Sequence, residues 1–275
     1  MIFICTATYF EGESFIKKLS LKKDINITKF QVFKNSNITL IITGVGKIKA
    51  TSALVHTFSI YNTQSPSLLI NFGICGASNK KLPIGTTYLC NKLIDNSSKK
   101  TYYTDIIYNT PFEEACIETY DTIINVPIDY EITGDLIDME AVGVYEGGSL
   151  FLHTHEIFII KLISDYLDAN SMNKPLVKEK INSATDEIIN WLNFLSTNLR
   201  KVPNTISPKE AELINSIADN LKFSTTMKND FKKELIYFKL SNGYLPDDLN
   251  QYSKIPCKSK REGKIYADSI RKELI

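Results

Sequence analysis

The sequence predicts an α/β fold, with a three-layer domain in which helices cover both faces of a sheet and a small helical appendage follows. Apolar runs of strand length alternate with stretches of helical periodicity over residues 1–199, which is the pattern of a sheet covered by helices. Residues 200–275 carry no convincing buried strand. At 275 residues and 43% hydrophobic composition, the chain is long enough for one large domain and such an appendage.

The strands and helices of the first domain are predicted from two different spacings. Short apolar runs that end in small or polar residues predict strands at 2–8, 29–35, 38–46, 67–77, 85–95, 116–126, 136–140 and 156–165. Apolar residues that recur every three or four positions predict helices that start at 11–19, cover 47–62, run through residue 153 after the strand at 136–140, and cover 178–199.

The appendage is predicted to be helical from its end signals. Ser207 is a helix N-cap, Pro208 stands at the first helical position, and Glu210 follows three residues after the cap, which together start a helix over 207–221. A second helix over about 225–241 ends at the Asn-Gly pair that follows, and the basic tail predicts a third. The appendage has 15 Lys and Arg against 10 Asp and Glu, whereas the remainder has 17 against 21.

Composition argues against several classes of protein. The net charge is +1, so no overall charge favours nucleic acid or a membrane surface as the partner. No apolar run reaches the roughly 18 residues of a membrane span, and the N-terminal run lacks a basic leader. Five widely spaced cysteines without a CxxC pair, and three histidines without metal spacing, favour a reducing cytoplasm and predict no disulfide framework, no metal site and no cofactor.

Two glycine-containing turns follow predicted strands. The segment ITGVGKIKATSAL (41–53) is a strand, a turn with Gly44 and Gly46, and a helix. Its spacing is not that of a P-loop, and the third glycine of a dinucleotide fingerprint would fall at Lys49. The segment NFGICGA (71–77) is similar. Each is consistent either with a tight turn that packs helix on strand or with a turn that approaches a ligand at a helix N-terminus.

Three carboxylates also follow predicted strands: Glu11, Glu140 and Asp165. Each alone has a structural explanation, since acids are favoured at helix N-termini and Asp is a common N-cap. Together they favour a site, because the carboxyl ends of neighbouring strands in an open α/β sheet meet at one edge, where ligands bind.

The order of these motifs resembles that of the purine nucleoside phosphorylase and uridine phosphorylase superfamily, and is most similar to the 5′-methylthioadenosine/S-adenosylhomocysteine nucleosidases. The matching stretches are ATYFEGE, TGVGKIKAT, NFGICGA, DLIDMEAVGVYE and KLISD, in the family's order across residues 1–199. The resemblance implies an αβα sandwich with a central mixed sheet, a homodimer, and a purine nucleoside or thionucleoside as the small-molecule substrate.

The resemblance also implies residue roles in cleavage of an N-glycosidic bond. Asp165 would be the acid that protonates N7 of the purine, and Glu140 would accept hydrogen bonds from ribose hydroxyls above Met139. Glu11 would position and deprotonate a water. The remaining residues implied to contact substrate or support these three are Thr43, Gly44, Val45, Gly46, Gly73, Ile123, Lys161 and Ser164. An acid on the base and a base for water on the opposite face is the arrangement of an inverting glycosidase.

Two departures from the family pattern leave alternatives open. The first arginine of the chain is Arg200, and arginine is the usual clamp for a phosphate dianion, so hydrolysis is favoured over a nucleoside phosphorylase. The segment between residues 77 and 136 is short for the family, and Ile123 or Ile124 stands near an expected base-stacking aromatic. A nucleoside-binding regulatory protein that has lost catalysis is therefore an alternative. The appendage would then contact a protein partner, whereas nucleic acid is a weak expectation.

Overall fold

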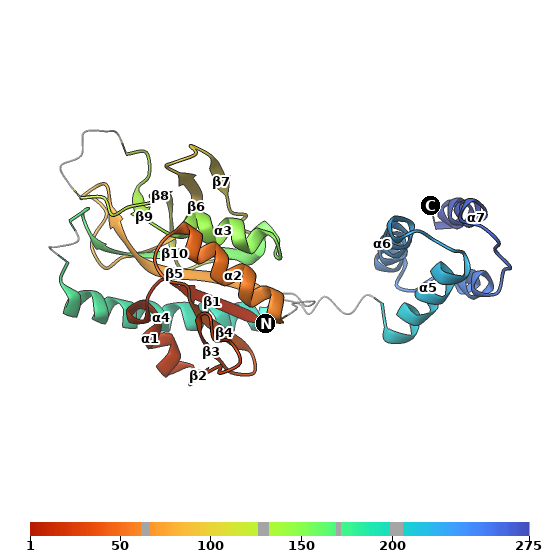
Figure 1. The fold of residues 1–275 in the computed structure, drawn as a ribbon, viewed down its shortest axis with the longest axis horizontal. Helices are drawn as coiled ribbons and strands as arrows, with labels where there is room; N and C mark the ends of the chain where they lie inside the picture. The colour runs from red at the N-terminus through yellow and green to blue at the C-terminus, as the bar shows by residue number, and fades with distance from the viewer. Residues whose placement is uncertain (62–66, 126–131, 169–171, 199–205, 275) are drawn as a thin grey trace. The chain divides into compact units, whose positions relative to one another are not determined.

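The computed structural model describes residues 1–61, 67–125, 132–168, 172–198 and 206–274 (Figure 1). The chain forms two compact units, Met1–Ser196 and Thr197–Ile275, called below the α/β unit and the helical unit. Arg200, and the change of character that we noted at Val202–Asn204, lie outside the described residues.

The α/β unit is the predicted αβα arrangement with a central mixed sheet. Its strands are β1 (Ile2–Thr6), β2 (Lys22–Lys23), β3 (Gln31–Lys34), β4 (Ile38–Ile42), β5 (Leu68–Ala77), β6 (Thr87–Asp95), β7 (Thr101–Tyr103), β8 (Glu113–Thr119), β9 (Leu136–Asp138) and β10 (Ile157–Asp165). Its helices are α1 (Tyr9–Lys18), α2 (Lys47–Tyr61), α3 (Ala141–Ser149), the short 3-10 helix η1 (Thr154–Glu156) and α4 (Lys174–Asn198).

The sheet topology brings four strands to one place. β5 lies between β1 and β10 and is parallel to both, so these three strands end at the same edge. β9 pairs antiparallel with the end of β5, with Gly76 opposite Ile137. The chain therefore returns over the edge at which β1, β5 and β10 end. Because β10 also pairs with β6, the strands β5, β9, β8, β6 and β10 form a closed ring of pairings.

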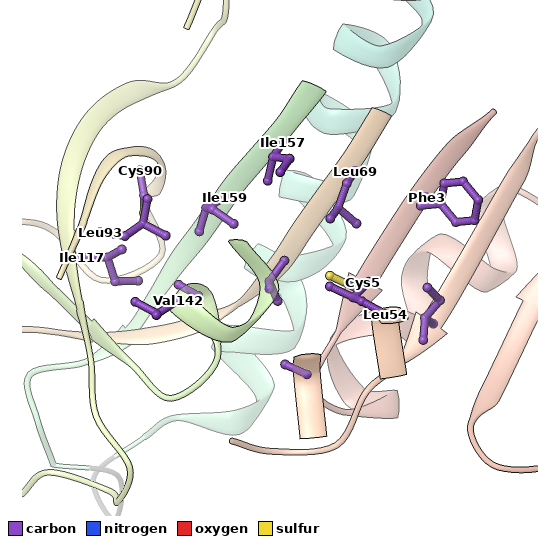
Figure 2. Packing of buried hydrophobic residues seen from close by; sticks show 14 of the residues in the cluster. Phe3, Cys5, Leu54, Leu69, Cys90, Leu93, Ile117, Val142, Ile157 and Ile159 are labelled. Atoms are coloured by element: carbon purple, nitrogen blue, oxygen red, sulfur yellow. The ribbon is translucent and has the colours of Figure 1, made fainter. Parts of the chain in front are cut away.

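The core has two halves, one on each face of the sheet. On one face, α2 and α3 pack Leu54 and Val142 against strand residues that include Phe3, Leu69 and Ile159 (Figure 2). On the other face, aromatic rings of α1 and α4 meet the strands edge to face: Phe15 packs against Phe72 at 5.4 Å and Trp191 against Phe158 at 5.0 Å between ring centroids. Strand residues thus alternate between the two helical layers, as two-sided burial of a sheet requires.

Several predicted bounds were wrong, and local contacts explain why. We predicted a strand at 116–126, but β8 ends at Thr119, level with Asp138, where its partner strand β9 also ends. Residue 126 lies outside the described residues. We predicted a helix through residue 153, but α3 ends at Ser149, directly after Gly147 and Gly148, which are poor helix formers. The two short edge strands β2 and β7 were not predicted.

The helical unit consists of α5 (Pro208–Asn220), α6 (Thr225–Asn242), η3 (Asp247–Ser253) and α7 (Lys260–Leu274). Its described residues contain no strand, in agreement with the prediction, although η3 was not predicted. Ser207 and Glu210 form the predicted capping box, and Gly243 ends α6 with a φ of 84°. Gly263 of α7 packs on Leu221, since a Cβ at this glycine would lie 1.9 Å from the Leu221 carbonyl oxygen.

Three kinds of feature are absent from the described part of the chain. No described helix is both long and apolar enough to span a membrane. The five cysteines are free, and four of them are buried. No group of three or more His, Cys, Asp or Glu side chains among the described residues is placed to hold a metal ion.

Candidate active site

A cavity of about 230 Å³ lies at the edge where β1, β5 and β10 end. Its lining includes all three carboxylates singled out in the sequence, Glu11, Glu140 and Asp165. Four further predicted residues also line it, namely Val45, Ile123, Met139 and Ser164. The return of β9 over the end of β5 is what brings Met139 and Glu140 beside residues of α1 and β10.

Glu11 is held by a capping box at the start of α1. Its Oε2 accepts hydrogen bonds from the amide and the hydroxyl of Thr8 at 2.7 and 2.8 Å. Its Oε1 accepts one from the amide of Ile74 at 3.0 Å, which ties the helix to β5. Glu11 is only 3% exposed, so this helix-start acid is also a buried carboxylate at the wall of the cavity.

Glu140 is the N-cap residue of α3, yet its carboxylate makes no capping hydrogen bond. Its Oε1 accepts instead from the amide of Gly46, at 2.8 Å, in the turn before α2. The cap of α3 comes from Asp138, whose Oδ2 accepts from the amide of Ala141 at 2.8 Å. The simple helix-start explanation therefore fits Asp138 better than Glu140.

Lys161 and Asp138 form a buried ion pair behind Glu140. The Lys161 ammonium lies 2.8 Å from Asp138 Oδ2, and each side chain is 1% exposed. Burial opposes the charge on Lys161, but the carboxylates of Asp138, Glu140 and Glu11 outweigh it and raise the lysine pKa. Burial and then the Asp138 charge raise the pKa of Glu140 to about 7, against the opposing effect of Lys161.

Asp165 ends β10, and its orientation follows from a register shift between β10 and β5 at Ile163 and Asp165. Such an irregularity re-aims a side chain at the end of a strand. The Asp165 carboxylate accepts from the Ser164 hydroxyl at 2.6 Å and from the Asp168 amide at 3.0 Å. Asp165 is 8% exposed, so a partly desolvated carboxyl with defined hydrogen bonds lies at the cavity.

The predicted glycines have distinct places. Gly44 and Gly46 adopt φ values of 84° and 103°, which favour glycine. A Cβ at Gly73 would lie 2.9 Å from Glu11 Oε1 and 3.4 Å from the Lys161 ammonium, so a glycine is needed for these two groups to approach the same point. We expected Thr43 to line the sugar side of the site, but it is not among the residues that line the cavity. Its hydroxyl donates instead to the carbonyls of Thr6 and Gly44.

Part of the remaining wall of the cavity is apolar, and Asp138 also lines the cavity. Ile137 and Leu167 belong to a small buried cluster against which Ile124 packs. Ile123 also lines the cavity and is 64% exposed. The carboxylates thus face a surface of the kind that holds a flat, weakly polar group.

Comparisons with known proteins were made on both the sequence and the structure. No family model and no curated protein matches the sequence. Solved structures do match. The chain is similar to the 5′-methylthioadenosine/S-adenosylhomocysteine nucleosidase of Helicobacter pylori, with 14% identity over 70% of this chain and 98% of that chain, and a TM-score of 0.59.

The chain has the fold of these nucleosidases. A futalosine hydrolase of H. pylori matches with 13% identity over 70% of this chain and 99% of that one, and a TM-score of 0.59. The corresponding nucleosidase of S. pneumoniae matches with 14% identity over 70% and 96%, and a TM-score of 0.52. The predicted resemblance is confirmed at the level of the nucleosidase fold, and at these identities the match carries no residue roles.

Sequence reasoning on the nucleosidase-like motifs missed the role of Asp138 in the site. From the sequence, Asp138 was expected only to cap a helix or to pair locally. A signal was present, because Lys161 stands within the otherwise apolar run IFIIKLI of a predicted buried strand, and a buried ammonium needs a carboxylate partner. Thr119 was missed too; its hydroxyl donates to Asp138 Oδ1 at 2.7 Å.

Proposed function

We propose that the α/β unit hydrolyses the N-glycosidic bond of a purine nucleoside or thionucleoside of the methylthioadenosine or adenosylhomocysteine type. The observation that carries this proposal is that Glu11, Glu140 and Asp165 line one cavity, each held by hydrogen bonds from a different element. The match to nucleosidase structures supports the reaction class, and the chemistry of each side chain supports its role.

Glu140 and Met139 take the sugar in this proposal. N-glycosidic cleavage develops positive charge on the ribose, as in other glycoside hydrolyses. A carboxylate beside the ring stabilises that charge and accepts hydrogen bonds from the hydroxyls. The hydrogen bond from the Gly46 amide to Glu140 Oε1 leaves Oε2 available for a ribose hydroxyl.

Asp165 takes the leaving base, and Glu11 takes the water. Proton transfer from Asp165 to the purine neutralises the leaving group, while the Ser164 hydroxyl orients the carboxyl. Glu11 Oε1 and the Lys161 ammonium lie 2.9 and 3.4 Å from the point that a Cβ at Gly73 would occupy. A water bound between these two groups would have a carboxylate to take its proton and an ammonium to orient its oxygen.

Water is favoured over phosphate as the nucleophile by the charges around the cavity. The α/β unit contains no arginine in its sequence. The buried ammonium of Lys161 is already paired with Asp138 at 2.8 Å. A phosphate dianion would meet Glu11, Glu140 and Asp165, and the α/β unit offers no guanidinium to bind it.

The test is base release by the full-length protein from methylthioadenosine, adenosylhomocysteine, adenosine and inosine, with and without phosphate. We expect free base without phosphate, and its loss in Asp165→Asn. Asp186→Asn is the matched control, since Asp186 is 60% exposed and pairs with Lys18 at the surface. Dependence on phosphate would indicate a phosphorylase. Thermal stabilisation by a nucleoside without turnover would instead indicate the nucleoside-binding protein.

A further inference from the structure

Asp138 joins three elements around the candidate site. Its Oδ1 accepts from the Thr119 hydroxyl of β8 at 2.7 Å. Its Oδ2 accepts from the Ala141 amide of α3 at 2.8 Å and pairs with the Lys161 ammonium of β10 at 2.8 Å. With the residue 5% exposed and both oxygens engaged, the Asp138 carboxylate has one fixed orientation.

The charges that face Glu140 do not balance. Asp138 on β9 and Glu11 on α1 are negative, and Lys161 on β10 is the positive group that acts on all three carboxylates. Within 4.0 Å, the described residues give Lys161 one carboxylate partner, Asp138. The thiol of Cys5 on β1 also lies near, but burial raises its pKa to about 12, so it stays neutral. Three buried carboxylates therefore share one ammonium.

We propose that Asp138 is a positioning residue, which engages Lys161 and so leaves Glu140 able to hold a proton until a nucleoside binds. This inference rests on the proposed function where it names the nucleoside. Ribose hydroxyls that donate to Glu140 favour its ionised form. On binding, the O–H bond of the Glu140 carboxyl breaks, its proton passes to solvent, and hydroxyl hydrogen bonds take its place. The carboxylate is then ready to stabilise positive charge on the sugar.

The pKa of Glu140 is shifted in the direction that this coupling between Asp138 and Glu140 requires. Burial and then Asp138 raise the pKa of Glu140 to about 7, so near neutral pH the free site holds both forms in similar amounts. Without the Asp138 charge, both the repulsion and the competing partner of Lys161 would be gone. Both changes favour the ionised form of Glu140.

The experiment is a carbon-13 NMR titration of the glutamate side-chain carboxyls in the full-length protein, with Glu140→Gln to assign the Glu140 signal. We expect a midpoint of about 7 in the unsubstituted protein and a fall of about one pH unit or more in Asp138→Asn. Lys161→Met should move the midpoint upward. Thr119→Val keeps the charges of Asp138 and Lys161 and removes one hydrogen bond, so the midpoint of Glu140 should not move. This variant therefore distinguishes an effect of charge from an effect of packing.

A midpoint near 4.5 in the unsubstituted protein, or one that Asp138→Asn leaves unchanged, would overturn the proposal. If Asp138→Asn does not fold, the titration of the unsubstituted protein and the upward shift in Lys161→Met decide alone. Calorimetry with adenosine at pH 7 in two buffers, on Asp165→Asn to block turnover, should show release of about half a proton per site, and no release would contradict the coupling.

This test is separate from that of the proposed function. A protein that titrates as expected but releases no base would contradict the nucleosidase activity and leave the role of Asp138 in place. A protein that releases base while Glu140 titrates at its ordinary value would contradict the role of Asp138 alone.

Discussion

In the described part of the chain, α1 and α5 begin with the same Ser/Thr–Glu capping box, and the box of α1 contributes its Glu to the cavity lining of the α/β unit. In α1 the box pairs Thr8 with Glu11, and in α5 it pairs Ser207 with Glu210. Glu210 lies at the surface of the helical unit, where its carboxylate also contacts the Lys239 ammonium at 2.6 and 2.7 Å. Glu11 is buried at 3% exposure and bonds β5 as well.

The difference shows that a local motif determines a local structure and leaves function to the tertiary partners. Both boxes satisfy free amides at a helix start, which stabilises each helix by about 1 kcal/mol. The α1 box places its carboxylate beside a cavity, a second carboxylate and a buried ammonium of its own unit. The two boxes should therefore differ in catalysis, in stability and in their response to pH.

The largest expected difference is in catalysis. Glutamine retains a capping oxygen, so Glu11→Gln and Glu210→Gln should both fold. Loss of a general base typically lowers the rate by about 10²–10⁴-fold, so we expect a fall of this size in kcat/KM for base release by Glu11→Gln. Glu210→Gln is the matched control and should leave kcat/KM unchanged. Equal activity of the two variants would remove Glu11 from the mechanism.

The residues around the α1 box show which parts of the site could be predicted from the sequence. Motif order was enough to single out Glu11, Glu140 and Asp165, because each follows a strand whose apolar run is readable, and the structure places them at one cavity. The pairing of Asp138 with Lys161 was not predicted. It depends on β9 turning back over β5, a register that no local pattern encodes.

The same reason explains the errors at the edges of elements. β8 was predicted too long, because Thr119 at its end pairs with Asp138 at the end of β9, nineteen positions further along the chain. The helical unit was predicted more closely. Its start and stop signals, from Ser207 to Gly243, act within a few residues of the helix ends that they define.

The next largest difference should be in stability. Lys161 near the α1 box should contribute more to the stability of its unit than Lys239 near the α5 box. Lys161→Met leaves Asp138 buried without its partner, which typically costs about 3–5 kcal/mol. Lys239→Met removes a partly exposed pair, whose loss should cost much less. Trp191 is the single tryptophan and is buried in α4, so its fluorescence during urea unfolding reports on the α/β unit. Amide hydrogen exchange of α5–α7 reports on the helical unit.

The double variant Asp138→Asn with Lys161→Met is the control for the buried pair. It removes both charges, so it should be more stable than Lys161→Met alone. If the two single lysine variants lost equal stability, the burial of the Asp138–Lys161 pair would have no energetic consequence, and the contrast between the two boxes would fail on this point.

The two units should also respond to pH in opposite directions. The pKa of Glu140 is raised to about 7, first by burial and then by Asp138, so the folded α/β unit binds this proton more tightly than the unfolded chain. Its stability should fall as the pH rises from about 4.5 to 7, by up to about 3 kcal/mol. Glu140→Gln should remove this slope from the Trp191 unfolding curves.

In the helical unit the sign is reversed. The hydrogen bond from Lys239, and then that from Ser207, lower the pKa of Glu210 to about 2. Its contribution is therefore present above about pH 4.5 and is lost as the pH falls toward 2. Hydrogen exchange of α5 at pH 3 and 5 in Glu210→Gln tests this. An α/β unit that gains stability from pH 5 to 7 through Glu140 would contradict the opposite signs.

The smallest expected effect concerns the capping hydroxyls themselves. Ser207→Ala removes one acceptor from the start of α5 and should destabilise the helical unit by about 1 kcal/mol, with base release unchanged. Thr8→Ala should cost the α/β unit a similar amount. It also removes the hydroxyl that bonds Glu11 Oε2 at 2.8 Å. Because Glu11 would then be held by two backbone amides alone, we expect kcat to fall several-fold while KM is unchanged. Thr8→Ser restores the hydroxyl and should restore kcat; a Thr8→Ala variant with full kcat would show that the capping box supports the helix alone, as in α5.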